Sequence, residues 1–267
     1  MKIQARNNVK TGGHGKATMV FAHGFGCDQH MWRLMAPAFQ SRFKTILFDL
    51  VGSGNSDLSA YDMVKYGTLH GYATDLIEII DEFADGPVVF VGHSVSACIG
   101  MLAAIAAPER FAAHFMVGPS PCYINDGDYI GGFTRSDIDD LLSTLERNYL
   151  GWSSTMAPAI MGSPEQPELS LELANSFCRT DPEIAKHFAR VTFLSDHRAE
   201  LSQVTTPSLI LQCSEDLIAP QSVGEYMHRA MPNSRLCVIE NVGHCPHLSA
   251  PSASADAMNN FLRQLDV

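Results

Sequence analysis

An apolar run of five residues, Pro87–Val91, leads directly into the sequence GHSVS at 92–96, and a helical pattern follows. A strand, a sharp turn and a helix in this order form the strained bend that lifts a nucleophilic serine clear of a sheet. Crowding at such a bend requires small residues two positions before and two positions after the serine. Gly92 meets the first requirement and Ser96 the second, although glycine is the usual residue there. The pattern predicts Ser94 as a nucleophile.

Short apolar runs alternate with longer helical patterns on both sides of this bend. Each run is bounded by turn residues and is apolar almost throughout, as expected of strands buried on both faces. Strands are predicted at Thr18–Ala22, Thr45–Phe48, Pro87–Val91, Ala113–Val117, Ser208–Cys213 and Arg235–Ile239. Helices are predicted at His30–Phe39, Leu69–Phe83, Val95–Ala107 and Pro251–Leu265. The alternation indicates an α/β fold with helices flanking a mostly parallel central sheet.

This alternation is interrupted between residues 121 and 193, where only helices are predicted. Glycine and proline mark the joints between these segments. The four predicted helices are Arg135–Asn148, Trp152–Met161, Pro167–Phe177 and Pro182–Phe193. We therefore predict a helical cap, 121–193, inserted in a core domain that is formed by 1–120 and 194–267.

A serine hydroxyl becomes an effective nucleophile when a histidine accepts its proton and an acid orients that histidine. In the α/β-hydrolase fold the chain order is serine, acid, histidine, which favours the segment after the last predicted strand. His244 lies nearer that strand than His247 and is predicted as the base. Asp216 follows the preceding strand and comes before an apolar pair, so it is predicted as the acid in preference to Glu215.

The negative oxygen of a tetrahedral intermediate is held by backbone N–H groups from two places in this fold. Val95, which follows the nucleophile, provides one of them. The loop after an early strand provides the other, and the sequence HGFG at 23–26 follows the first predicted strand directly. Phe25 is therefore the predicted second donor of the oxyanion hole.

Charge and hydropathy exclude several classes of partner. The formal net charge is −11, from 29 acidic and 18 basic residues, and no cluster of Lys or Arg suits a row of phosphates. No nucleic acid is therefore expected as a partner. No stretch approaches the ~18 consecutive apolar residues of a membrane-spanning helix, so membrane insertion is not expected. Residues 1–16 are polar and glycine-rich rather than a secretory signal, which favours a cytoplasmic location.

Seven cysteines are scattered along the chain without the paired spacings of a zinc or redox motif, and reduced thiols are expected. His244, Cys245 and His247 are close in sequence, but a metal site would need further ligands that the sequence does not group with them. Neither a metal nor a cofactor is therefore expected. Serine at position 94 also disfavours the branches of the fold that use an aspartate nucleophile.

In these residues and the segments around them, the chain resembles the family of the stress-response regulator RsbQ and of the karrikin and strigolactone receptors of plants. The resemblance extends from about Asn8 to Leu262. It is carried by GFGCDQ at 24–29, LFDLVGSG at 47–54, LHGYA at 69–73, GHSVSA at 92–97, GPSPCYIND at 118–126, YIGGF at 129–133, SDHR at 195–198 and HCPHL at 244–248. Serine at position 96 is shared with the plant receptors.

The resemblance implies the same triad and oxyanion donors, and a four-helix lid over a deep apolar pocket. The implied pocket lining is Phe25, Phe133, Trp152, Met156 and Phe193. Packing between lid helices is the alternative role for these side chains. Met156 stands where the receptors have phenylalanine, so the shape of the ligand is expected to differ.

Two functions are consistent with this interpretation. The first is hydrolysis of a small, mostly apolar ester or lactone through an acyl-enzyme on Ser94. The second is signalling, in which slow hydrolysis or ligand occupancy changes the lid surface and engages another protein. The resemblance implies a phosphatase with a PAS sensor domain as the partner of an RsbQ-like protein, and ubiquitin-ligase components as partners of the plant receptors.

Overall fold

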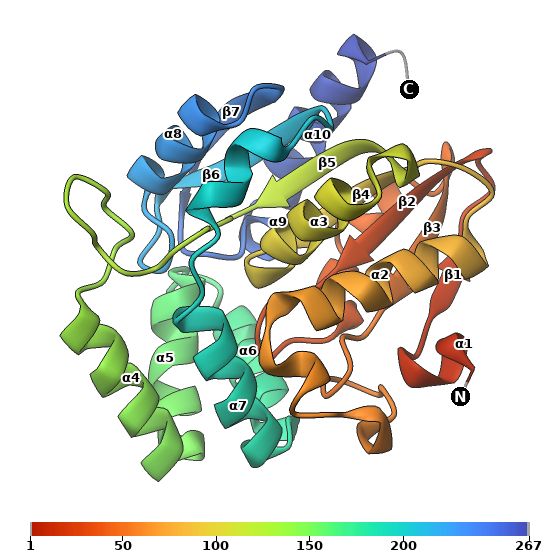
Figure 1. Cartoon of the computed structure of the whole chain (residues 1–267). Helices are drawn as coiled ribbons and strands as arrows, with labels where there is room; N and C mark the ends of the chain where they lie inside the picture. Colours follow the sequence, from red (N-terminus) through yellow and green to blue (C-terminus); the bar gives the residue numbers. More distant parts are fainter. Residues whose placement is uncertain (1, 266–267) are drawn as a thin grey trace.

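The computed structural model describes residues 2–265, and a seven-stranded sheet forms its centre (Figure 1). The strands are β1 (Lys10–Gly12), β2 (Ala17–Ala22), β3 (Phe43–Phe48), β4 (Val88–His93), β5 (Phe111–Val117), β6 (Ser208–Glu215) and β7 (Ser234–Val242). Their order is β1-β3-β2-β4-β5-β6-β7, and only the pairing of β1 with β3 is antiparallel. The predicted α/β fold with a mostly parallel sheet is confirmed. All six predicted strands are present, whereas the short edge strand β1 was not predicted.

The central strand β4 is buried on both faces of the sheet. Val88 and Phe90 contact one apolar core, together with α2 (Leu69–Phe83), α3 (Val95–Ala106) and α8 (Gln221–Ala230). Val89 and Val91 contact a second core on the opposite face, where α10 (Pro251–Gln264) packs. Full burial of one such side chain contributes about 1.5–3 kcal/mol, so both helical layers hold β4 and the turn that follows it rigidly.

Four helices lie together beside the sheet, at the lower left of Figure 1. They are α4 (Arg135–Arg147), α5 (Tyr149–Met161), α6 (Pro167–Arg179) and α7 (Pro182–Phe193). Their apolar faces form a third core with residues of the loops that follow β2 and β7, including Cys27 and Cys245. Asn148 ends α4 and caps α5, because its side chain accepts a hydrogen bond from the Gly151 N–H. The division into a core domain and a lid stays a prediction.

The helix predicted over His30–Phe39 is wrong. The segment forms two short 3₁₀ turns, Gln29–Trp32 and Ala36–Ala38. Pro37 explains the difference, since it has no N–H to donate to the carbonyl of Arg33 and its ring would clash with that carbonyl in an α-helix. Two short helices, α1 (Ile3–Arg6) and α9 (Pro246–Ser249), complete the fold. No helix within residues 2–265 is both long and apolar enough to cross a membrane.

Candidate active site

Ser94 lies at the turn between β4 and α3 in a strained backbone conformation, with φ 55° and ψ −122°. A positive φ is uncommon for a residue other than glycine and requires support from the surrounding structure. The Ser94 N–H donates to the Val117 carbonyl at 2.8 Å, which provides part of that support. Gly92 is required for space, because a Cβ there would lie 2.5 Å from the backbone oxygen of Ser96. The turn thus has the geometry of the predicted nucleophile bend.

Ser94, His244 and Asp216 form a continuous chain of hydrogen bonds. His244 Nε2 lies 2.8 Å from Ser94 Oγ, and His244 Nδ1 lies 2.7 Å from Asp216 Oδ2. The Asp216 side chain is fully buried, and its second oxygen accepts hydrogen bonds from the N–H groups of Ile218 and Ala219. These bonds fix the orientation of the Asp216 side chain. An imidazole held in this way can accept a proton from Ser94.

The loop that carries His244 is joined to the helical region. The His244 N–H donates to the Ile160 carbonyl of α5 at 2.8 Å. Gly243 comes directly before it with φ 102°, and a Cβ there would lie 1.9 Å from the Met161 carbonyl. Any side chain at position 243 would therefore push α5 away from the loop that holds His244.

The two predicted oxyanion donors are close to the nucleophile. Val95 is the first residue of α3, so its N–H has no partner within the helix. The loop before Phe25 touches the bend, since a Cβ on Gly24 would lie 3.3 Å from Ser94 Cβ. Ser96 joins the two segments, because its hydroxyl donates to the His23 carbonyl at 2.5 Å and both residues are buried. The departure from glycine at position 96 thus provides a link between α3 and this loop.

A small apolar cavity of about 40 Å³ opens above Ser94. Three of the predicted lining residues border it with Ser94 and His244, namely Phe25, Trp152 and Phe193. Its other lining residues are Cys27, His93, Tyr123, Ile160, Leu173, Phe177, Thr192, Ile218 and Cys245. No carboxylate, ammonium or guanidinium group borders this cavity in the described part of the chain. The cavity favours an uncharged, compact group beside the nucleophile.

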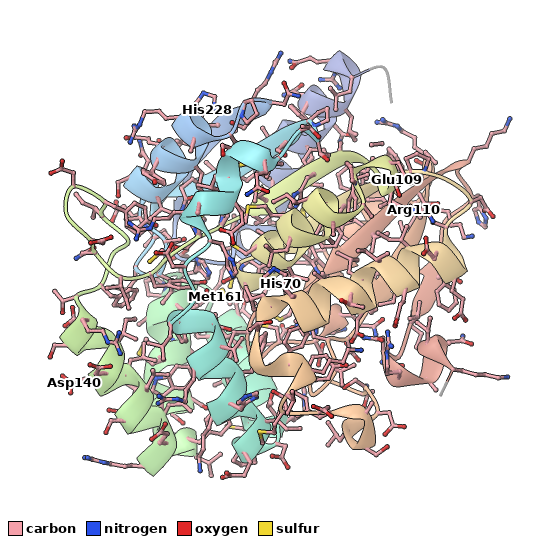
Figure 2. The ribbon with its side chains drawn as sticks, viewed as in Figure 1. His70, Glu109, Arg110, Asp140, Met161 and His228 are labelled. Carbon is pink, nitrogen blue, oxygen red and sulfur yellow. The ribbon has the colours of Figure 1, made fainter. Side chains whose placement is uncertain are left out.

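The other two predicted lining residues, Phe133 and Met156, border a separate open groove of about 710 Å³ between α4 and α5. Trp152 borders both spaces and separates them. Its ring packs edge-on against Phe25, with the ring centres 6.1 Å apart. The rim of the groove is acidic, and Asp140 projects outward from α4 at the left of Figure 2.

Tyr123 was not predicted as a site residue, yet it borders the cavity and its ring packs against Phe193 at 5.1 Å. Burial raises the pKa of its hydroxyl well above the ordinary value. Tyr123 therefore stays protonated and can donate a hydrogen bond into the site. Its place in the GPSPCYIND segment at 118–126 is the only sequence signal that pointed to it.

The profile of the alpha/beta hydrolase family matches residues 19–257. The chain belongs to this family. This alpha/beta hydrolase is 38% identical to karrikin insensitive 2 receptor CA of Petunia hybrida over 250 residues, 93% of each chain. It is also 38% identical to strigolactone esterase RMS3 of Pisum sativum over 259 residues, which cover 96% of this chain and 97% of that one. The predicted resemblance to the plant receptors is confirmed.

The solved structure of a hydrolase from Oleispira antarctica superposes on this alpha/beta hydrolase with a TM-score of 0.94 and 42% sequence identity. The match covers 98% of this chain and 96% of that one, so it includes the four helices α4 to α7 as well as the sheet. The same arrangement of sheet and helices is therefore present in another hydrolase.

Proposed function

We propose that this alpha/beta hydrolase is a serine hydrolase that cleaves a small, mostly apolar ester or lactone. The observation that carries the proposal is the hydrogen-bonded chain from Asp216 through His244 to Ser94, with the serine in a strained turn. Among its relatives is a protein named as a strigolactone esterase, which supports ester chemistry at the same site. A triad of this kind serves acyl transfer on several unrelated folds.

In the first step, Ser94 Oγ attacks the carbonyl carbon while His244 Nε2 accepts its proton. Asp216 stabilises the imidazolium that forms. The N–H groups of Phe25 and Val95 hold the negative oxygen of the tetrahedral intermediate. The alcohol then leaves with the proton from His244, and Ser94 carries the acyl group. Water, activated by His244, attacks the acyl carbon and restores the free serine.

The cavity supports a substrate with a compact acyl part. Its volume of about 40 Å³ and its apolar walls leave room for a small uncharged group next to Ser94. Trp152 separates this space from the groove between α4 and α5. We propose that α4 to α7, within 121–193, act as a lid over the core domain of 1–120 and 194–267, and that the ligand reaches the cavity by movement of this lid.

Hydrolysis of p-nitrophenyl acetate tests the proposal. Ser94→Ala removes the nucleophile, so we expect its rate to fall to that of the buffer. Ser154→Ala is the matched control, because Ser154 lies on the exposed face of α5 and bonds only to the Leu150 carbonyl of its own helix. Equal rates of nitrophenol release by wild type and Ser94→Ala would contradict the proposal that Ser94 catalyses hydrolysis.

A receptor function is the second candidate, and the contact between the His244 loop and α5 favours it. Because His244 N–H bonds to Ile160 and Gly243 touches Met161, chemistry at Ser94 can move the lid. We propose a cytoplasmic protein partner, such as a phosphatase with a PAS sensor domain, that binds the altered lid. Hydrogen exchange over α4 to α7, with and without strigolactone, tests the lid change. Unchanged exchange at saturating ligand would contradict it.

A further inference from the structure

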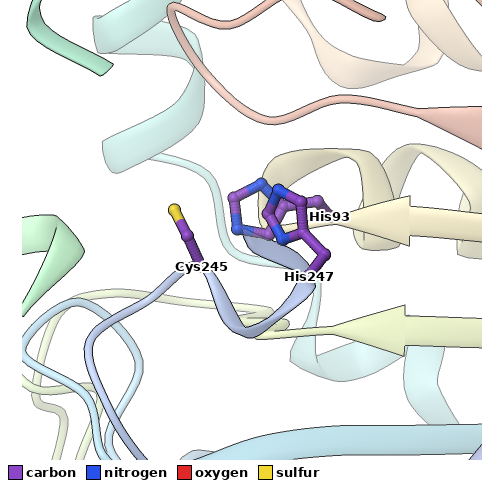
Figure 3. A group of neighbouring side chains, drawn as sticks. All are labelled: His93, Cys245 and His247. Carbon is purple, nitrogen blue, oxygen red and sulfur yellow. The ribbon is translucent and has the colours of Figure 1, made fainter. Parts of the chain in front are cut away.

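Three potential metal ligands meet behind the candidate active site. His93 lies at the end of β4, while Cys245 and His247 lie at the start of α9, and their ligand atoms are all within 4.8 Å of one another. Figure 3 shows the two imidazole rings side by side, with Cys245 next to them, two residues before His247. The sequence grouped His244, Cys245 and His247 but no further ligand. The fold brings His93 to Cys245 and His247 from a segment about 150 positions earlier in the chain.

Three of the four ring nitrogens of this cluster have no hydrogen-bond partner among the described residues. His93 Nε2 donates to the His244 carbonyl at 2.9 Å, which leaves a bare lone pair on Nδ1. That Nδ1 and both nitrogens of His247 are buried without a partner. An unpaired buried polar group is costly, so each one requires a reason. A bound ion would take the lone pairs of His93 Nδ1 and of one His247 nitrogen, and the His244 carbonyl already accepts the outer hydrogen bond that fixes a ligating histidine.

We propose that His93, Cys245 and His247 bind a thiophilic cation of the Zn²⁺ class. One thiolate and two imidazoles are the ligand types that Zn²⁺ prefers. At bond lengths of about 2.0–2.3 Å, ligand atoms around a tetrahedral ion lie roughly 3.4–3.6 Å apart. The ligand atoms, which lie up to 4.8 Å apart, must therefore move closer by up to about 1.3 Å when the ion binds. On binding, the Cys245 thiol forms the metal–sulfur bond and releases its proton to solvent.

The surrounding side chains hold the two histidines close together. Both rings are buried, and their centres are 4.3 Å apart. The ring of Trp32 packs on His247 at 4.7 Å and holds it in place.

The site adjoins the cavity beside Ser94, so a bound ion would affect hydrolysis. His93 and Cys245 also line the cavity beside Ser94, so an ion bound to them would adjoin that cavity. The rings of His93 and His244 are 5.0 Å apart. A positive charge at this distance disfavours the imidazolium that His244 forms during acyl transfer. Zinc is therefore expected to inhibit hydrolysis, a consequence that rests on the proposed function.

Calorimetric titration of the full-length protein with Zn²⁺ tests the site without any substrate. We expect one Zn²⁺ per chain in wild type, affinity at least about 100-fold weaker in Cys245→Ala, and no binding of Mg²⁺. Cys98→Ala is the matched control, because Cys98 is a buried thiol outside the cavity wall, and it should bind zinc as wild type does. Co²⁺ should give a thiolate charge-transfer absorption in wild type and in Cys98→Ala only.

Equal zinc affinity in wild type and Cys245→Ala would overturn the proposal, as would the absence of binding by the folded wild type. Cys245→Ser preserves the size of the side chain and gives the same comparison if the alanine variant does not fold. Because binding is measured directly, the two proposals can fail separately. Zinc binding without hydrolysis of p-nitrophenyl acetate would support the metal site and contradict only the proposed hydrolase function.

Discussion

Ser96 joins the bend at Ser94 to the loop that carries Phe25, the proposed second oxyanion donor, and its hydroxyl can be removed with little change in size. The hydroxyl donates to the His23 carbonyl at 2.5 Å, and both residues are fully buried. In Ser96→Ala this carbonyl loses a donor and gains no water, which costs about 1–3 kcal/mol. His23 lies two residues before Phe25, so the same change also frees the loop that positions the Phe25 N–H.

Two effects are therefore expected from Ser96→Ala. The free energy of unfolding, measured by denaturant titration, falls by about 1–3 kcal/mol. The kcat for p-nitrophenyl acetate falls by about 10–100-fold, below the 10²–10³ that follows complete loss of one oxyanion donor, because the donor is displaced rather than deleted. KM changes little, since the oxyanion exists only in the transition state and the intermediate.

A second buried serine separates the two effects. Ser208 on β6 also donates its hydroxyl to a backbone carbonyl, that of Thr206 at 2.9 Å, and it does not border the cavity. Ser208→Ala should lower stability by a similar amount and leave kcat unchanged. Wild-type kcat in Ser96→Ala, or an equal loss of kcat in Ser208→Ala, would refute the positioning role of Ser96.

Three further predictions concern Asp216, Trp152 in the cavity wall and the buried His114. Asp216→Asn should lower kcat by about 10⁴ at nearly unchanged stability, because the imidazole loses its orienting charge; a loss under 10-fold would contradict this. Trp152→Leu should join the cavity to the groove and raise the rate on p-nitrophenyl butyrate relative to acetate by about 10-fold, whereas an unchanged ratio would show that Trp152 does not limit chain length. Burial lowers the pKa of His114 to about 3, whereas in the unfolded chain it binds a proton near pH 6.5, so stability should fall as the pH drops from 6.5 to 3. Denaturant titrations of His114→Phe should show a flatter pH dependence, and an identical slope would contradict the assignment.

The parts of the fold that depend on neighbouring residues could be predicted from the sequence alone. The bend at Ser94 needs only a strand, small neighbours and a helix, and all of them are adjacent in the chain. Chain order then selected Asp216 and His244 from many acids and eleven histidines. The strand β1 was missed because it is a three-residue edge strand with an exposed, polar sequence. Such a strand lacks the apolar pattern by which strands are recognised.

Other features depend on contacts between distant segments. Tyr123 and Phe177 reach the cavity only because α6 and the loop before α4 pack toward Ser94, and no local pattern encodes that packing. The predicted lining residues are divided between a cavity and a groove. This division depends on the position of the Trp152 side chain of α5, which borders both spaces. The cluster with His93 likewise needs the end of β4 to meet the loop after β7.

Mass spectrometry of the intact protein shows directly whether Ser94 forms the proposed covalent acyl-enzyme. Rapid quenching during turnover of p-nitrophenyl acetate should trap one acetyl group per chain, and peptide mapping should place it on Ser94. Asp216→Asn should carry less of this adduct, since its acylation is slowed. Nitrophenol release with no adduct on Ser94, or with the acetyl group on another residue, would contradict acylation of Ser94.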